Sequence, residues 1–486
     1  MGKDKGIDTT PRNSMATDTE MQRQKLVGDA VEHTEDVHID GEQSKFSAIL
    51  GILRKLIGVA DVINLRLSLP SQLLDPIPNL EYWNYMDSPE HFVAMHALNT
   101  ISAPGWFGLL ALRELSSQIT EPDDEVERML AMLAWWFSKL LKHTGKVHKP
   151  FNSVLGEQFF CKWEVGGNGS TSNATQTATD NVSANSSDAK REDTVASSIT
   201  NVSAGNSSSG GSKLSVEYIT EQVSHHPPVS AFVYRCKERG IEAAGVDHIA
   251  AKFTGLSATV ATGSECRGIF VTLKQRNDEM YKSTHPVGSI VGWMRGSLKV
   301  QLIESSYIVC AKTGLATIIE FKEERWFGKN KGNVTGKVFR YDDKVHGDKI
   351  AGWRLKDIPK ACTTVATFGG NWDQKVMVQR VDGTSKDDAE RLLIDMAVLQ
   401  AAEKQVKPVE EQGEMESRRI WGPVASKMLE GKFSEATRIK RGIEDKQRAL
   451  AAARKERGEV VVPVLFKPDY SSNGKPELLD DAPINI

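Results

Sequence analysis

A long series of short β-type runs most strongly limits what this chain can fold into. Between residues 213 and 381, runs rich in β-branched and aromatic residues alternate with glycine-containing turns. The clearest runs extend from Ile269 to Leu273, Ile290 to Trp293, Leu298 to Leu302, Ala316 to Phe321, Lys337 to Tyr341 and Lys375 to Val378. This spacing predicts a large antiparallel sheet, and closure into a barrel would remove its edges. Because the polar-out alternation is imperfect, we expect one face to line an apolar cavity.

Helical patterns flank this β region on both sides. Residues 79–118 hold many aromatic side chains and short helical patterns, and a stripe from Val126 to Leu141 begins just after Pro122 and ends near Gly145. Apolar residues at helical spacing also predict helices near residues 45–60 and over 387–402. The apolar segment at residues 460–468 is expected to dock back onto the body. The predicted fold class is therefore α+β, with a large antiparallel β-barrel and flanking helices.

Composition bounds the class of protein. The chain has 486 residues, of which 40% are apolar, so one large domain or two can form. The net charge is −3, which gives no bulk positive field for nucleic acid. Five scattered cysteines predict buried thiols in a reducing compartment. Without a secretory signal or a run of ~20 apolar residues, we expect a cytoplasmic protein that contacts membranes only from outside.

Three segments are predicted to lie outside the folded core. Residues 1–44 have the composition of a disordered arm, and residues 166–212 are almost entirely Gly, Ser, Asn, Thr, Ala and Asp. The second segment is expected to be a disordered insert between two neighbouring strands. Residues 469–486 are expected to form a polar C-terminal tail.

The strongest motif is the octapeptide at residues 221–228, Glu-Gln-Val-Ser-His-His-Pro-Pro. Apolar and polar residues alternate before it, and a β-type run follows it, so it lies at a corner between two strands. The two prolines fix their own φ angles and restrict the residue before them. His225 and His226 are therefore presented on a stiff corner.

Paired imidazoles could ligate a metal, act as acid and base, or donate hydrogen bonds to an anion. No His-x-x-x-His or Cys-x-x-Cys spacing accompanies them, which disfavours zinc. A Gly-x-Ser-x-Gly nucleophile elbow is also missing, although Ser224 lies next door. The two histidines could also simply be satisfied in a turn.

The octapeptide resembles the signature of the oxysterol-binding protein-related family. Two further stretches resemble that family in the expected order: residues 149–157, Lys-Pro-Phe-Asn-Ser-Val-Leu-Gly-Glu, and residues 440–448, Lys-Arg-Gly-Ile-Glu-Asp-Lys-Gln-Arg. Weaker similarity extends over residues 45–468. Residues 416–419, Glu-Ser-Arg-Arg, resemble the family's approach to its last long helix, which is expected here over residues 433–457. The resemblance implies one lipid-binding domain of the short, fungal type without accessory modules, closed by a lid at about residues 45–78.

The resemblance also implies a site. A ring of polar side chains at the entrance of a lipid tunnel would hold a phosphorylated head group, and it would comprise Lys149, Asn152, His225, His226, Lys440, Glu444 and Arg448. From spacing alone, the last three occupy one face of a helix and would be interpreted as a solvated face. Gly442 weakens that helix. We expect no metal, no cofactor and no catalytic residue.

The function implied is exchange of a sterol and phosphatidylinositol 4-phosphate between membrane surfaces by a monomer that is not an enzyme. Phosphatidylserine is the alternative second ligand, because residues 142–150 form a short connection like that of members that handle it. Residues 130–137 and 161–164 resemble sterol-binding members and favour sterol. A lipid sensor or scaffold without transfer, and a serine hydrolase that uses Ser224 with His225 or His226, are also compatible with these residues.

Overall fold

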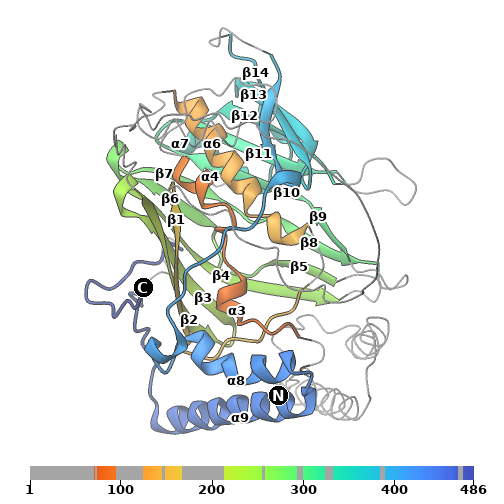
Figure 1. Ribbon diagram of the computed structural model, residues 1–486. Coiled ribbons are helices and arrows are strands. Elements are labelled where there is room, and N and C mark those ends of the chain that lie inside the picture. Colours follow the sequence, from red (N-terminus) through yellow and green to blue (C-terminus); the bar gives the residue numbers. More distant parts are fainter. Residues whose placement is uncertain are drawn as a thin grey trace, which may run out of the picture.

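The structure is a computed structural model that describes residues 71, 74–94, 124–144, 148–166, 213–253, 258–292, 299–322, 332–347, 349–383, 389–468 and 474–486. The expected N-terminal arm, most of the expected lid and nearly all of the expected insert lie outside these residues. In the part that is described, the strands form one 15-stranded antiparallel sheet (Figure 1). This architecture confirms the predicted fold class.

The sheet follows a simple path along the chain. Its main order is β1-β2-β3-β4-β6-β7-β10-β11-β12-β13-β14-β15, while β5, β8 and β9 extend from the far half of β4. The strands are β1 (Gln158–Val165), β2 (Leu214–His225), β3 (Pro228–Cys236), β4 (Ile241–Phe253), β5 (Ala258–Thr262), β6 (Ile269–Leu273), β7 (Glu279–Ser283), β8 (Val287–Val291), β9 (Lys299–Ile303), β10 (Ser305–Cys310), β11 (Leu315–Phe321), β12 (Asn333–Arg340), β13 (Thr364–Asn371), β14 (Lys375–Arg380) and β15 (Arg391–Asp395). Every run predicted as a strand from the sequence overlaps one of these.

The described helices are short except for three. They are α3 (Asn79–Tyr82), α4 (Pro89–Ala94), α6 (Glu125–Ser138), α7 (Asp343–His346), α8 (Ser417–Leu429) and α9 (Phe433–Arg457). The long final helix has the predicted bounds. The predicted stripe that ends near Gly145 is α6 followed by a 3-10 turn at Leu141–His143.

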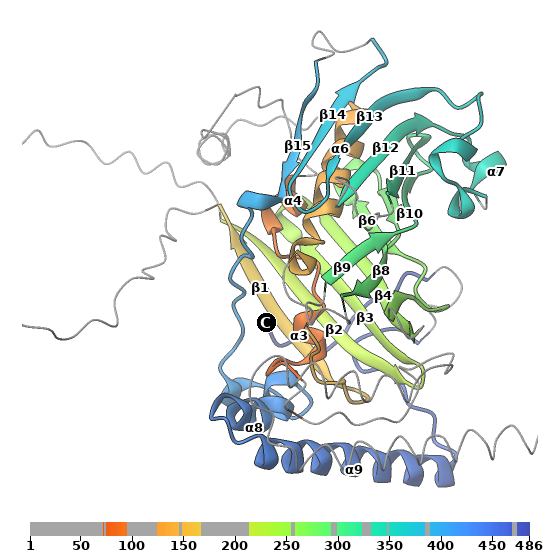
Figure 2. The same ribbon diagram turned by 90° about the vertical axis from the view of Figure 1, so that its right-hand side faces the viewer.

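Helix α6 lies on the concave side of the sheet, where 12 of its 14 residues are buried. Trp136 stacks on Phe321 of β11, and Phe137 contacts Phe368 of β13 edge to face. The indole N–H of Trp136 also donates to the Thr284 carbonyl oxygen, 2.8 Å away, just after β7. Because strands far apart in the sheet all contact one helix, the sheet curves around it (Figure 2).

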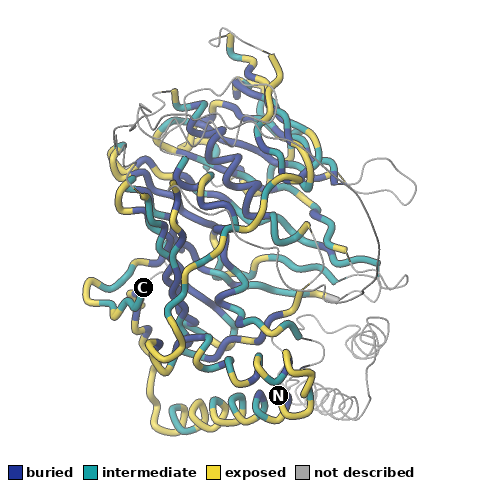
Figure 3. The backbone as a smooth tube through the Cα atoms, in the orientation of Figure 1, coloured by how far each residue is buried: buried dark blue, intermediate teal, exposed yellow. Residues whose placement is uncertain are grey.

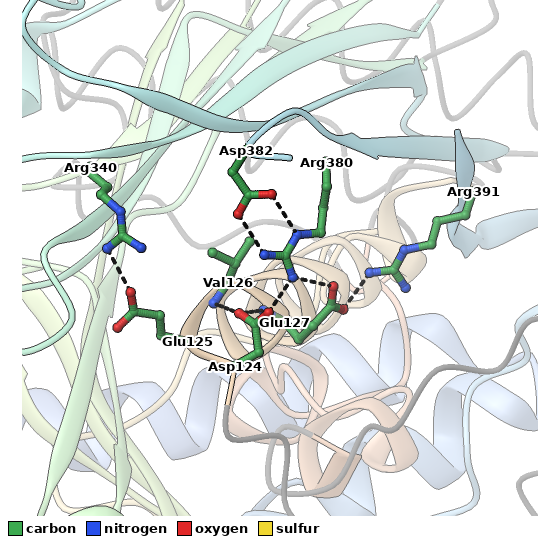
Figure 4. A network of polar contacts seen from close by, with 8 residues as sticks. All are labelled: Asp124, Glu125, Val126, Glu127, Arg340, Arg380, Asp382 and Arg391. Carbon is green, nitrogen blue, oxygen red and sulfur yellow. Dashed lines mark hydrogen bonds and ion pairs between the residues drawn. The ribbon is translucent and has the colours of Figure 1, made fainter. Parts of the chain in front are cut away.

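A charged network holds the N-terminus of α6 against the strands (Figure 4). Asp124 caps the helix by accepting the backbone N–H groups of Val126 and Glu127, which would otherwise be unpaired. Its second oxygen lies 2.5 Å from the guanidinium of Arg380, which also reaches Glu127 and Asp382. The predicted helix start is thereby tied to β14.

One prediction was wrong. Residues 387–402 were expected to be helical, but β15 pairs with β14, and a 3-10 turn follows at Met396–Val398. Ile394 and Met396 are buried in the main core, while Leu392 is 48% exposed. The helical spacing was accidental. This segment pairs with β14 at the edge of the sheet, and a short sequence pattern does not contain information about such pairing.

The chain after β15 runs back along β1. Lys162 and Gln405 exchange backbone hydrogen bonds of 2.8 and 3.0 Å, and Gln158 forms a bridge with Glu416. This segment covers the β1 edge before α8 begins. Helices α8 and α9 then lie together across one end of the curved sheet (Figures 1 and 2).

The C-terminal segment packs on the outer face of the sheet. Leu465 and Phe466 are fully buried against Phe160, Ile219 and Val233, which confirms the expected docking. Leu478, Ala482, Ile484 and Ile486 pack on the same cluster. The described part of the expected polar tail is therefore attached to the body. Among the helices that the structure describes, none combines the length and the apolar character needed to span a bilayer.

Candidate functional site

The corner between β2 and β3 presents the paired histidines, as predicted. The Ser224 hydroxyl donates to the Pro227 carbonyl oxygen at 2.8 Å, and the Gln222 amide donates to the Ser224 carbonyl oxygen at 2.7 Å. The rings of His225 and His226 meet edge to face with centroids 4.7 Å apart, and both residues are exposed. Since the Ser224 hydroxyl is committed to the turn, it is not oriented as a nucleophile toward either imidazole.

Two buried carboxylates fix this corner to its neighbours. Glu221 accepts the backbone N–H groups of Val464 and Leu465, each at 2.8 Å, and so ties β2 to the C-terminal segment. Glu157, just before β1, accepts from the hydroxyl of Ser417 at 2.7 Å and from the indole of Trp421 at 3.0 Å. Desolvation raises the pKa of Glu157 to about 7. The loop at residues 148–157 is therefore held on α8.

That loop carries Lys149 and Asn152. The Lys149 amine donates to Asn152 Oδ1 at 2.8 Å and to the Pro150 carbonyl oxygen at 3.0 Å. The backbone N–H of Lys149 donates to Asp75 Oδ2 at 2.7 Å, and His148 Nδ1 lies 3.2 Å from Asp75 Oδ1. Sequence analysis missed Asp75, because a single aspartate in a leucine- and proline-rich linker has no distinguishing pattern.

Helix α9 contributes an ion pair. Lys440 Nζ lies 2.9 Å from Glu444 Oε1, and the two side chains are 3% and 15% exposed. The other carboxylate oxygen of Glu444 is buried and has no hydrogen-bond partner among the described residues. The helix continues through Gly442. The solvated-face interpretation is therefore wrong for Lys440 and Glu444.

Arg448 differs from the other predicted site residues. Its guanidinium pairs with Asp445 at 2.5 Å, and its side chain is 53% exposed. Desolvation lowers the pKa of Lys440, Glu444 opposes this shift, and Arg441 and then Arg448 add smaller lowering effects. Arg448 therefore belongs to the rim of the cluster and is directed toward solvent.

The loop at residues 148–157, the β2–β3 corner and α9 lie close enough for their charged groups to affect one another. Desolvation and then repulsion from Lys440 lower the pKa of Lys149 to about 8, while Glu444 and Asp75 act in the opposite direction. Desolvation and His226 lower the pKa of His225, whereas a hydrogen bond to the backbone of Ser153 and the charge of Glu444 oppose this shift. The loop at 148–157, the β2–β3 corner and α9 thus form one cluster, which we call the head-group cluster.

A second polar group lies inside the curved sheet. Lys139, at the end of α6, is 2% exposed, and its amine lies 5.1 to 5.7 Å from the ring centroids of Tyr85, Trp135 and Trp136. The Tyr85 hydroxyl donates to Asp247 at 2.7 Å, and His285 Nε2 lies 4.0 Å from the same carboxylate oxygen. Desolvation moves the pKa of both Lys139 and Asp247 to about 7.

Several polar atoms of this interior group lack partners. The amine of Lys139, the indole N–H of Trp135 and Nε2 of His285 have no hydrogen-bond partner within the described ranges. Buried polar atoms are almost always satisfied by protein or by ordered water. The interior of the sheet therefore has polar positions that water or a ligand can satisfy.

In the part of the chain that the structure describes, no group of three or more His, Cys, Asp or Glu side chains is arranged to hold a metal ion. Cys161, Cys236, Cys310 and Cys362 are buried free thiols, and Cys266 is half-buried.

Fold and site together define a lipid-binding domain, and comparison with known proteins gives its family. The family model described as oxysterol-binding protein matches residues 110–428, so the chain belongs to the oxysterol-binding protein family. Oxysterol-binding protein-like protein 1 of Schizosaccharomyces pombe is 35% identical, over 92% of each chain. Oxysterol-binding protein-like protein OBPa of Candida albicans is 27% identical, over 71% of this chain and 64% of that protein.

Solved structures show the same fold. The Osh1 ORD domain in complex with cholesterol has a TM-score of 0.56 at 18% identity, and the match covers 87% of this chain and 84% of that one. The Osh3 ORD in complex with PI(4)P from Saccharomyces cerevisiae has a TM-score of 0.51 at 16% identity, over 89% of each chain. At these identities the comparison concerns the fold alone.

Proposed function

We propose that this protein carries a lipid inside the curved sheet and binds the phosphorylated head group of phosphatidylinositol 4-phosphate at the head-group cluster. One observation carries the proposal: the fold brings Lys149 of the 148–157 loop, the histidine pair of the β2–β3 corner and Lys440 of α9 into one cluster, although these segments are far apart in the sequence. Glu444 compensates one positive charge by pairing with Lys440, so a further anion is favoured beside the two ammonium groups. A phosphate between them accepts charge-assisted hydrogen bonds from both amines.

The remaining members of the cluster complete the head-group contacts. Burial lowers the pKa of His225, which favours its neutral form, and a neutral imidazole can still offer a ring N–H to phosphate. Asn152 can accept from an inositol hydroxyl, and Glu444 keeps Lys440 protonated. Arg448 is exposed at the rim and can swing from Asp445 toward a second phosphate oxygen.

Sterol is the second ligand that we propose for the interior of the sheet. One structural relative is complexed with cholesterol and another with PI(4)P, so the shared fold accommodates both chemistries. Moving hydrocarbon from a bilayer into an apolar interior is close to neutral, although it is worth on the order of 10 kcal/mol against water. Loading is therefore reversible, and the protein exchanges the two lipids between membranes without a chemical step. Phosphatidylserine is the alternative second ligand.

The test follows labelled lipids between two populations of vesicles. Wild-type protein should move phosphatidylinositol 4-phosphate and a fluorescent sterol in opposite directions and leave both chemically unchanged. H225A/H226A should lose extraction of the phosphoinositide but retain sterol binding, and K344A/K349A, which changes exposed residues away from the cluster, should behave as wild type. Unaltered phosphoinositide extraction by H225A/H226A would reject the site, and release of fatty acid or head group would favour a hydrolase.

A further inference from the structure

An exposed apolar segment follows α9. Val460, Val461, Val462 and Val464 are 87%, 38%, 63% and 49% exposed. Leu450, on the last part of α9, is 43% exposed, and its neighbours Ala449, Ala451 and Ala452 are also exposed. Four exposed valines within residues 460–464 indicate an interaction site.

This segment is held at both ends, so the valines cannot turn into the core. At one end, Gly458 adopts a left-handed conformation with φ +65°, and its N–H bonds back to the helix and ends α9. At the other end, Leu465 and Phe466 are fully buried, and the Glu221 carboxylate holds the backbone N–H groups of Val464 and Leu465. The exposure of residues 460–462 is therefore imposed by their anchors.

Basic residues predominate on the helix that precedes the valines. Helix α9 carries eight basic and four acidic residues, in a chain whose net charge is −3. Three of the basic residues, Arg454, Lys455 and Arg457, occupy its last turn, directly before the valine segment. Arg457 is paired with Glu459 at 2.5 Å, and both side chains are about half exposed. This part of the surface is therefore both apolar and cationic.

The exposed valine segment is joined to two elements, α9 and β2, that carry residues of the head-group cluster. Helix α9, which carries Lys440, lies across one end of the sheet, and the chain turns upward from its C-terminal end (Figures 1 and 2). The outward side of α9 and the chain that follows it are mostly exposed (Figure 3). Glu221, the anchor of the valine segment, lies four residues before His225 on β2.

We propose that Leu450, the cationic last turn of α9 and residues 460–464 form a docking surface for an anionic bilayer. The valines enter the apolar boundary of the membrane, while Arg454, Lys455 and Arg457 contact lipid head groups. This proposal rests on the proposed function, since docking here brings the head-group cluster close to the membrane from which lipid is taken.

Charge and shape favour a bilayer over a protein. Cations beside projecting valines match a fluid anionic surface, because such a surface attracts Lys and Arg side chains near it. An extended run of β-branched residues could instead pair with a strand of a partner protein. Vesicles that contain no protein separate these two occupants.

The first experiment measures co-sedimentation of the full chain with vesicles of phosphatidylcholine, with and without phosphatidylserine. Wild-type protein should bind the anionic vesicles more strongly, and V460N/V462N should bind them more weakly, on the order of tenfold. The matched control V345N/V398N replaces valines that are 53% and 60% exposed elsewhere, and it should bind as wild type. Equal binding by V460N/V462N and wild type, or no binding by wild type, overturns the proposal.

The second experiment tests the cations. R454Q/K455Q/R457Q should lose the preference for anionic vesicles and show a weaker dependence on salt, whereas K344Q/K349Q/K360Q should keep both. An unchanged salt dependence in R454Q/K455Q/R457Q would also overturn the proposal.

Failure of docking can be separated from failure of the proposed function. A short-chain, water-soluble phosphatidylinositol 4-phosphate should bind V460N/V462N as tightly as it binds wild type, because no bilayer is involved. If this soluble lipid does not bind wild type while vesicles do, the head-group site fails and the docking surface stands.

Discussion

Lys440 Nζ lies 2.9 Å from Glu444 Oε1, one helical turn away, and the pair is largely buried where α9 meets the body of the protein. A buried ion pair contributes little to stability by itself, but removing one partner leaves an uncompensated charge. The neighbouring Lys149 depends on the same carboxylate, since Glu444 raises its pKa. Replacements in this pair can therefore affect the stability of the fold and the binding of the head group differently.

Replacing one partner of this pair should therefore cost more stability than replacing both. We expect Lys440→Met to lower the free energy of unfolding by about 2 kcal/mol, because Glu444 is then stranded. Lys440→Met combined with Glu444→Met should recover most of that loss, while neither variant binds the phosphorylated head group. Urea denaturation and binding of the short-chain phosphoinositide measure the two effects, and a double variant no more stable than the single one would contradict the account.

Head-group affinity should depend on pH through Lys149. The pKa of its free amine is lowered to about 8, and a bound phosphate raises it, so binding is full below that pKa and weakens as pH rises through it. Above about pH 7 the phosphate itself has completed its second ionisation, with pKa ≈ 6, and does not contribute to this change. Titration calorimetry of wild type between about pH 7 and about pH 9 should show the loss.

Lys149→Arg supplies the control for this pH dependence. An arginine stays protonated over the whole range, so the affinity of this variant should vary much less with pH. An equal decline in both proteins would exclude Lys149 as the titrating group.

Glu157 should give stability an unusual pH dependence. Its folded-state pKa is raised from 4.5 to about 7, so the folded protein binds more protons than the unfolded chain between these values, and stability falls as pH rises through them. We expect Glu157→Gln to remove up to about 3 kcal/mol of that decline. Chemical denaturation at about pH 5 and about pH 7 measures it. Glu410→Gln, at an exposed position, should leave the decline in place.

Replacement by methionine should have opposite effects on the stability of the protein at Lys139 and at Lys142. The amine of Lys139 has no hydrogen-bond partner in the described structure, whereas that of Lys142 donates to the carbonyl oxygens of Tyr82 and Asn84 and lies 3.5 Å from Asp87. Lys139→Met should be neutral or stabilising, since Asp247 can take up a proton at its pKa of about 7.

Lys142→Met should instead cost about 2–4 kcal/mol, because it leaves buried acceptors unpaired. Thermal unfolding at constant pH compares the two variants. A loss for Lys139→Met as large as that for Lys142→Met would show that Lys139 has a structural partner.

Much of the fold could be predicted because it depends on local pattern. The alternation before residue 221 and the two prolines placed His225 and His226 at a corner between strands, where β2 and β3 meet. The helix over Phe433–Arg457 was also predicted, from the resemblance of residues 416–419 to the family's approach to its last long helix. The segment at residues 387–402 failed because pairing with β14 outweighs a short helical spacing.

The sequence by itself determined the antiparallel β class and the corner with its two histidines. It also placed Lys149 and Lys440 in family motifs. Each of these features depends on residues that are close together in the sequence. Only the tertiary structure decided that Asp75 holds the Lys149 loop, that Glu444 is buried with Lys440, that Arg448 turns toward Asp445 and that the valines after α9 remain exposed. The physical reason is that desolvation and charge coupling depend on which distant segments meet, and local pattern does not contain that information.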